Sequence, residues 1–225
     1  YDIILPYSNL FKKKGIFMIG SLASTLVGIN LLAYVMVILR PRLYNTKLYT
    51  PMLTNIKLSI LPIFILMTLM VSIIIIQAVA VWIPNSILLD VLTMVVAIIG
   101  LIVWILLLPN SGYLITELNF NHREQDATEV PLWYDIVGIL SLAMSGVMNM
   151  CFNVFMIHFF VSIWIRSLFT DISFLFNSLS WLTMATLMVL SSFGIYMGRY
   201  IRFNSWDVKH PIQFLKKLRN HFVDK

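Results

Sequence analysis

Five long runs of apolar residues, each almost free of charge, constrain this chain more than any other feature of its sequence. A helix rises about 1.5 Å per residue, so about 20 apolar residues are needed to cross roughly 30 Å of hydrocarbon. All five runs reach that length, and the predicted spans are residues 16–39, 58–81, 87–108, 134–165 and 172–198. The sequence therefore predicts an all-α fold: a polytopic transmembrane helical bundle of about five spans, forming one integral membrane domain over residues 1–225.

The low charge content excludes a soluble enzyme. Of the 225 residues, 60% are hydrophobic and only 12% are charged, whereas a soluble domain contains about 25% charged residues. Lys and Arg number 16 against 10 Asp and Glu. These cations flank the apolar runs as membrane anchors do, so we expect no nucleic-acid partner. The single cysteine, Cys151, lies inside an apolar run, which excludes a disulfide framework and a cysteine-ligated metal site.

The fourth run is the one whose topology is open. From Ile136 to Ile165 it contains no Lys, Arg, Asp or Glu. A hairpin near Asn149 to Asn153 would raise the number of spans to six, as would a further span missing beyond the C-terminus. A single helix of this length extends about 45 Å, which is enough to cross a bilayer at a tilt. We therefore expect one span here and five in the chain.

Orientation follows from the cations beside the spans, because Lys and Arg collect on the cytoplasmic side. With five spans, one side of the membrane holds Lys12, Lys13, Lys14 and Arg166. The opposite side holds Arg40, Arg42, Lys47, Lys57, Arg123, Arg199, Arg202, Lys209, Lys216, Lys217, Arg219 and Lys225. The second side is predicted to be cytoplasmic, although the three consecutive lysines then lie outside. The tail, residues 205–225, is expected there as an amphipathic interfacial helix.

A stripe of small polar residues lies within the fourth run. Ser141, Ser145, Asn149 and Asn153 are spaced by four, so they share one slowly drifting face of a helix. Such side chains favour interhelical packing through amide hydrogen bonds, and the alternative is the wall of a polar cavity. His158 is interpreted as a neutral packing residue. The four histidines have no metal-ligand spacing, so we expect no metal site and no cofactor.

Two small residues and two arginines end the fifth run. Gly194 and Gly198 form a GxxxG pattern, which lets another helix approach closely, either in this chain or in a homo-oligomer or membrane protein partner. Arg199 and Arg202 follow at the predicted cytoplasmic boundary. Two guanidinium groups there either extend to lipid phosphates or hold a carboxylate or an anionic ligand.

Four segments together resemble one known family. They are Asn55–Pro62, Pro109–Leu118 (PNSGYLITEL), Pro131–Asp135 (PLWYD) and Ser191–Asp207 (SSFGIYMGRYIRFNSWD). Over about residues 50–210, the chain is similar to the DUF1361 family of uncharacterised prokaryotic integral membrane proteins. The resemblance implies a multi-pass helical protein of the bacterial cell membrane, and it implies no activity.

The five-span topology places the last three of these segments on the predicted cytoplasmic face. We therefore expect a ligand-binding site made of Asn110, Tyr113, Glu117, Tyr134, Asp135, Arg199, Arg202, Asn204 and Asp207. The favoured hypothesis is a binding or accessory membrane subunit that holds an anionic lipid or partner. The alternative is a membrane-embedded transferase or hydrolase acting on a lipid-linked anionic substrate, with Glu117 or Asp135 as general base and Tyr113 assisting. A small transporter is less favoured, because no internal repeat is found.

Overall fold

The computed structural model describes the backbone of residues 4–83, 86–119, 130–168 and 173–196, together with Lys216 and Arg219 of the tail. Side chains are described for residues 20–83, 86–118, 130–161 and 181–196, and for the same two tail residues. Several residues of the predicted site lie outside these ranges. They are Arg199, Arg202, Asn204 and Asp207, and Gly198 and most of the predicted tail helix also lie outside.

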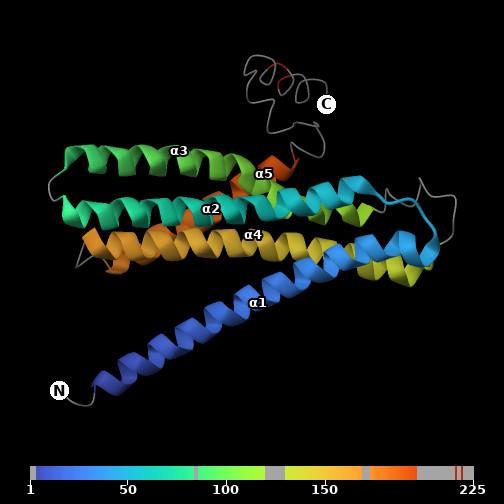
Figure 1. Ribbon diagram of the computed structural model, residues 1–225, viewed down its shortest axis with the longest axis horizontal. Helices are drawn as coiled ribbons and strands as arrows, with labels where there is room; N and C mark the ends of the chain where they lie inside the picture. The colour runs from blue at the N-terminus through green and yellow to red at the C-terminus, as the bar shows by residue number, and fades with distance from the viewer. Residues whose placement is uncertain are drawn as a thin grey trace.

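Every element in the described ranges is a helix. In chain order they are α1 (Ile4–Tyr44), α2 (Thr50–Trp82), α3 (Ile87–Gly112), the 3-10 helix η1 (Tyr113–Asn119), α4 (Leu132–Leu168) and α5 (Ser173–Tyr196). Four helical segments are long and apolar enough to cross a membrane: Gly20–Tyr44, Thr50–Trp82, Ile87–Leu118 and Leu132–Val161. A shorter apolar helix, Trp181–Tyr196, accompanies them. The predicted all-α polytopic bundle of about five spans is confirmed (Figure 1).

The fourth run forms one continuous helix, so the hairpin alternative is wrong. α4 extends without interruption from Leu132 to Leu168. At the proposed turn, Asn153 Nδ2 donates to the carbonyl oxygen of Asn149 at 2.9 Å, as a side chain does within regular helix. Both asparagines are fully buried against other helices, which removes the reason for a turn at this point.

Two helices begin at least two turns before the apolar runs that predicted them. α1 begins at Ile4 and α2 at Thr50, where a proline occupies the first turn. Proline is tolerated there because that turn has no intrahelical acceptor for its missing N–H. The apolar pattern marks only the part of a helix that crosses hydrocarbon, so it misses polar turns beyond the bilayer core.

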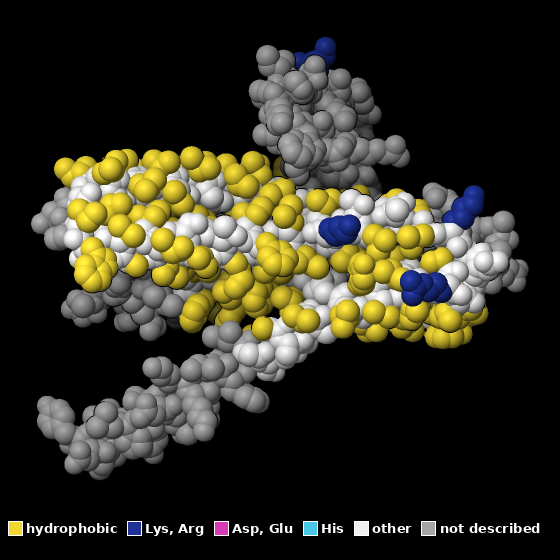
Figure 2. Space-filling view, viewed as in Figure 1, with side chains coloured by type: hydrophobic (Ala, Val, Ile, Leu, Met, Phe, Trp, Pro, Cys, Tyr) yellow, Lys and Arg dark blue, Asp and Glu magenta, His cyan; other side chains and the backbone are white. Residues whose placement is uncertain are grey.

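α4 lies at the centre of the packing, because it contacts every other helix and η1. Half of its apolar window is buried, against between 11% and 28% in the other three long spans. One core cluster consists of Ala33, Val37, Met52, Ile56, Leu114 and Leu142, and a second consists of Leu66, Met70, Trp104, Leu108, Ile157 and Leu187. The outward faces carry exposed large hydrophobic side chains, as expected for surfaces in contact with lipid (Figure 2).

Glycines permit the closest helix contacts. At Gly146 of α4, a Cβ atom would lie 2.9 Å from Leu114 Cβ and 3.2 Å from the Ser111 carbonyl oxygen, so the glycine lets η1 approach. Gly194 of α5 packs against the ring of Pro109 in α3. The predicted close approach at Gly194 is therefore a contact within the chain. Oligomerisation through Gly194 and Gly198 stays a prediction.

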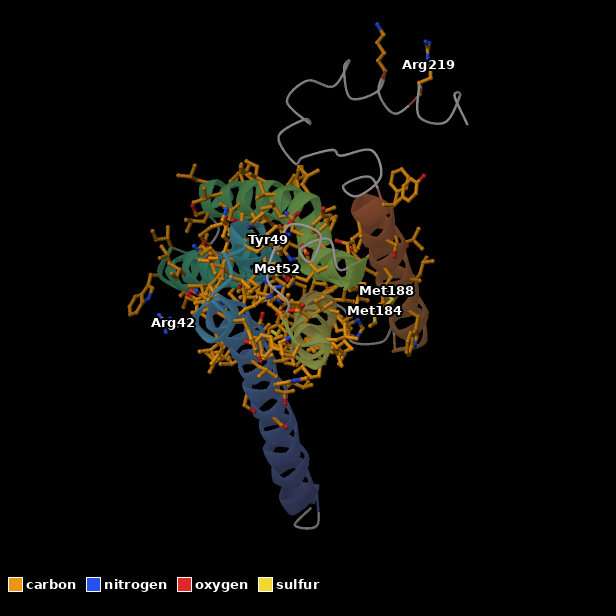
Figure 3. The ribbon with its side chains drawn as sticks, turned by 90° about the vertical axis from the view of Figure 1, so that its right-hand side faces the viewer. Arg42, Tyr49, Met52, Met184, Met188 and Arg219 are labelled. Atoms are coloured by element: carbon orange, nitrogen blue, oxygen red, sulfur yellow. The ribbon has the colours of Figure 1, made fainter. Side chains whose placement is uncertain are left out.

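α1 belongs to the bundle only in its C-terminal half. Its N-terminal half leaves the other helices, and this divergence is visible in both ribbon views (Figures 1 and 3). A Cβ atom built on Gly20 or Gly28 would meet nothing within 4 Å. The residues of α1 that are buried or half-buried toward the bundle recur every three or four positions: Leu26, Asn30, Ala33, Val37 and Arg40. This spacing is the seam that two packed helices require.

Candidate functional site

The α1–α2 turn, η1 and the first turn of α4 meet at one end of the bundle, on the right in Figure 1. This end therefore brings together Glu117, Tyr134 and Asp135 of the predicted site, with Asn110 and Tyr113 at the junction of α3 and η1. Figure 3 looks onto this end and shows Arg42 extending away from the bundle, whereas Tyr49 and Met52 lie among the helices.

Asp135 is paired with a residue of α1. Arg40 Nε donates to Asp135 Oδ1 at 2.9 Å, and the two residues are only 8% and 2% exposed. The Nη1 group of Arg40 lies 3.5 Å from Thr46 Oγ1, in the turn that follows α1. A carboxylate this deeply buried needs a cation beside it, because an unpaired charge in a low dielectric is costly. The charge partner of Asp135 in the described part of the chain is thus Arg40.

Tyr134 also connects α1 and α4. Its hydroxyl donates to the carbonyl oxygen of Met36 at 2.9 Å, and the residue is 4% exposed. Its ring meets those of Tyr44 and Trp133 edge-on, with centroid separations of 5.0 and 5.7 Å. The hydroxyl is directed to α1, so the side chain is engaged in helix packing.

Glu117 has a partner of its own. Its Oε1 accepts a hydrogen bond of 2.8 Å from Asn55 Nδ2, which ties η1 to the first turns of α2. Tyr113 is half-buried, and its carbonyl oxygen accepts from Thr116 Oγ1 at 2.7 Å. Glu117 and Asp135 therefore reach the same end of the bundle, but each is held by a different neighbour.

A small cleft opens beside the Arg40–Asp135 pair. We call it the Lys47 cleft. It is lined by Met36, Val37, Arg40, Pro41, Lys47, Tyr49, Met52, Tyr134, Asp135, Gly138, Ile139 and Leu142. The volume of the cleft is about 20 Å³, enough for one water-sized group. Lys47 is exposed, whereas Arg40 and Asp135 are buried.

The predicted stripe of α4 faces a polar network in the interior. Asn30 Nδ2 donates to Asn149 Oδ1 at 2.7 Å, and Asn149 Nδ2 donates back to Asn30 Oδ1 at 3.0 Å. Asn149 Nδ2 also donates to Ser59 Oγ at 2.8 Å, so one amide joins α1, α2 and α4. Ser145 Oγ lies 3.4 Å from Asn30 Oδ1.

The network continues into α3. The hydroxyls of Ser59 and Ser111 donate to each other's carbonyl oxygens at 2.8 and 3.0 Å. Asn153 Nδ2 donates to Ser111 Oγ at 3.2 Å, and Trp104 Nε1 donates to Asn153 Oδ1 at 3.0 Å. Since the amide groups of both asparagines are used within the bundle, the structure agrees with interhelical packing and not with a cavity wall.

Among the described residues, no group of three or more His, Cys, Asp or Glu side chains lies together in a way that could hold a metal ion. His158 is half-buried in α4, next to a core residue. Cys151 is exposed on α4.

Comparison with known proteins then places the chain. The model of the family described as "Protein of unknown function (DUF1361)" matches residues 55–225. The chain belongs to the DUF1361 family. No curated protein and no solved structure matches it. In this DUF1361 protein, Asn55, Glu117 and Asp135 lie within the matched residues, whereas Arg40 and Lys47 precede them.

Arg40 is the site residue that the sequence alone does not distinguish, because it resembles any cation at the end of a span. A signal is nevertheless present. Asp135 is an acid at the start of one apolar helix and Arg40 a base at the end of another, on the same predicted side of the membrane. Opposite charges in those positions favour a pair.

Proposed function

We propose that this DUF1361 protein is a noncatalytic binding or accessory subunit of the cell membrane, whose polar end faces the cytoplasm and holds an anionic lipid or membrane protein partner. The observation that carries the proposal is the engagement of both candidate acids. Asp135 is 2% exposed and paired with Arg40, and Glu117 accepts from Asn55. A general base must reach the proton that it removes, and neither carboxylate is positioned as an open, unengaged base.

The distribution of charge supports an anionic ligand. In the described ranges, the cations at the end of α1 and in the α1–α2 connection are Arg40, Arg42 and Lys47, and they outnumber Glu117 and Asp135. Figure 2 shows Lys and Arg side chains toward the same end of the bundle. Cations at a membrane boundary attract anionic lipid headgroups, by about 1 kcal/mol for each Lys or Arg near the surface. Arg199 and Arg202, outside the described residues, would add to this attraction if they reach the same face.

The test is mass spectrometry of the full-length protein after purification in mild detergent. We expect anionic phospholipid, or a stoichiometric protein partner, to be enriched over the membrane extract. Arg199→Ala combined with Arg202→Ala should reduce that enrichment, whereas the tail control Lys216→Ala with Arg219→Ala should not. A retained lipid profile equal to that of the extract, with no bound protein, contradicts the proposal.

The transferase or hydrolase alternative is tested on the same preparation. A lipid-linked phosphate substrate is added and its conversion is followed by mass spectrometry. Binding without conversion is the expected result. Conversion that stops in Glu117→Gln or Asp135→Asn would favour the enzyme and overturn the noncatalytic assignment.

A further inference from the structure

We infer that the Lys47 cleft is the subsite that receives the headgroup phosphate of an anionic glycerophospholipid, a phosphodiester with one negative charge. This inference rests on the proposed function and gives it a ligand class and a location. The two cations of the cleft precede the residues that the family match covers.

The charge of the cleft matches a single negative charge. Arg40 and Asp135 neutralise each other across 2.9 Å, and Lys47 remains as the third charged group of the lining. For Lys47 the structure records no ion pair with any acid in the described part of the chain. Summed over the described lining residues, the net charge is one positive charge, which suits a phosphodiester better than the two negative charges of a phosphomonoester.

The Arg40 end of the buried ion pair lies near the turn that carries Lys47. Asp135 engages the Nε group of Arg40, while Nη1 lies near Thr46, the residue before Lys47. The turn itself is tight, because Asn45 has a φ of 53°, a left-handed conformation that asparagine tolerates. This turn returns the chain over the end of α1, so that Lys47 lines a cleft shared with α4.

The size of the cleft sets how much of the ligand enters. About 20 Å³ accommodates one water-sized group, such as one phosphate oxygen, and not a whole headgroup. Much of the lining is apolar, including Met36, Met52 and Ile139. The rest of the headgroup must therefore lie across the mouth of the cleft.

The surroundings of the cleft favour a lipid over a soluble phosphate. Leu43 in the last turn of α1 and Leu48 in the α1–α2 connection are 59% and 44% exposed, and Trp133 beside the cleft residue Tyr134 is 62% exposed. Leucine and tryptophan exposed next to a lysine are typical of a membrane interface, where chains and headgroups meet. A lipid places its phosphate at the lysine and its acyl chains along these side chains.

The experiment measures phosphatidylglycerol binding to the full-length protein by native mass spectrometry, with phosphatidylethanolamine as the zwitterionic reference. Lys47→Gln should weaken phosphatidylglycerol binding about fivefold, the loss expected for one interfacial cation. The matched control is Lys57→Gln, an exposed cation of α2 outside the cleft lining, for which less than a twofold change is expected. Lys47→Arg should retain binding.

A second variant fills the cleft without changing its charge. A Cβ atom at Gly138 would meet only Met36, at 3.9 Å, so Gly138→Ala should fold normally while occupying part of the space. We expect it to weaken phosphatidylglycerol binding with Lys47 intact. Equal retention by wild type, Lys47→Gln and Gly138→Ala would overturn the subsite.

The outcomes separate this inference from the proposed function. If wild type retains phosphatidylglycerol but Lys47→Gln loses no more than Lys57→Gln, the lipid binds elsewhere and only the subsite is wrong. If wild type shows no preference for phosphatidylglycerol and retains no partner, the proposed function fails as well. Displacement of the lipid by millimolar inorganic phosphate would identify a soluble-anion site and contradict a lipid subsite.

Discussion

The reciprocal amide pair between α1 and α4 gives the sharpest test of how the bundle is held together. Asn149→Ala removes three hydrogen bonds: two with Asn30, at 2.7 and 3.0 Å, and one of 2.8 Å to Ser59. Interhelical hydrogen bonds in membrane proteins contribute about 0.6 kcal/mol each, and loss of a buried side chain adds a cavity term. We therefore expect a loss of about 2–3 kcal/mol in the free energy of unfolding.

The loss should not be larger, because the partners of Asn149 keep other hydrogen bonds. Asn30 Nδ2 still donates to the carbonyl oxygen of Leu26 at 2.8 Å, and Ser59 Oγ still donates to that of Ser111 at 2.8 Å. A buried donor left alone costs about 1–3 kcal/mol, and that penalty does not arise here.

A double-mutant cycle isolates the pair itself. Asn30→Ala and Asn149→Ala, measured singly and together, should show a coupling of about 1.2 kcal/mol, the worth of two such hydrogen bonds. Reversible unfolding in mixed micelles, titrated with a denaturing detergent and followed by tryptophan fluorescence, supplies the free energies. Thr68→Ala is the control, because the hydroxyl of this exposed residue donates to the Phe64 carbonyl oxygen within its own helix. Coupling below about 0.3 kcal/mol would refute an energetic role for the pair, since non-interacting sites already deviate from additivity by that much.

Two further predictions use the same protein. Gly146→Ala should lower the free energy of unfolding by about 1–3 kcal/mol, because the new methyl group meets η1. The control Gly28→Ala has nothing within 4 Å of the new methyl group and should leave that free energy unchanged within about 0.5 kcal/mol. Both are measured by the same detergent titration. In a background where the exposed Cys151 is replaced by serine, a membrane-impermeant thiol reagent should label Glu117→Cys and Asp90→Cys from opposite sides of the membrane; labelling from one side would contradict the up-and-down order of the helices.

The sequence predicts those parts of the fold that depend on local pattern. Apolar length alone locates the helices, and a spacing of four places Asn149 and Asn153 on one face of α4. The residues that pair with that face cannot be predicted from local pattern, because they depend on how α1 and α3 are rotated against α4. An isolated amide such as Asn30 in an apolar run does signal a need for a partner. Nothing local identifies the partner as Asn149, which lies 119 positions away.

The candidate site is likewise predictable from the sequence only in part. Convergence of Glu117 and Asp135 at one end follows from counting spans, since Glu117 follows the third span, Asp135 begins the fourth, and no crossing lies between them. The pairing of Asp135 with Arg40 depends on packing, because several cations flank the same end and charge alone does not choose among them. The predicted roles of Arg199, Arg202, Asn204 and Asp207 stay predictions, because these residues lie outside the described ranges.

The seam between α1 and α4 also constrains how the protein is made. Asn30 and Arg40 of the first helix have partners 119 and 95 positions later in the chain. At ribosomal rates of roughly 5–20 residues per second, α4 emerges on the order of ten seconds after α1. During that interval the Asn30 side chain would have only the Leu26 carbonyl oxygen of its own helix as a partner within lipid, and Arg40 would lack its carboxylate at the membrane boundary. α1 is therefore expected to stay beside the insertion machinery, or at the water interface, until α4 arrives, so that release of the first helix into the bilayer waits for synthesis of the fourth.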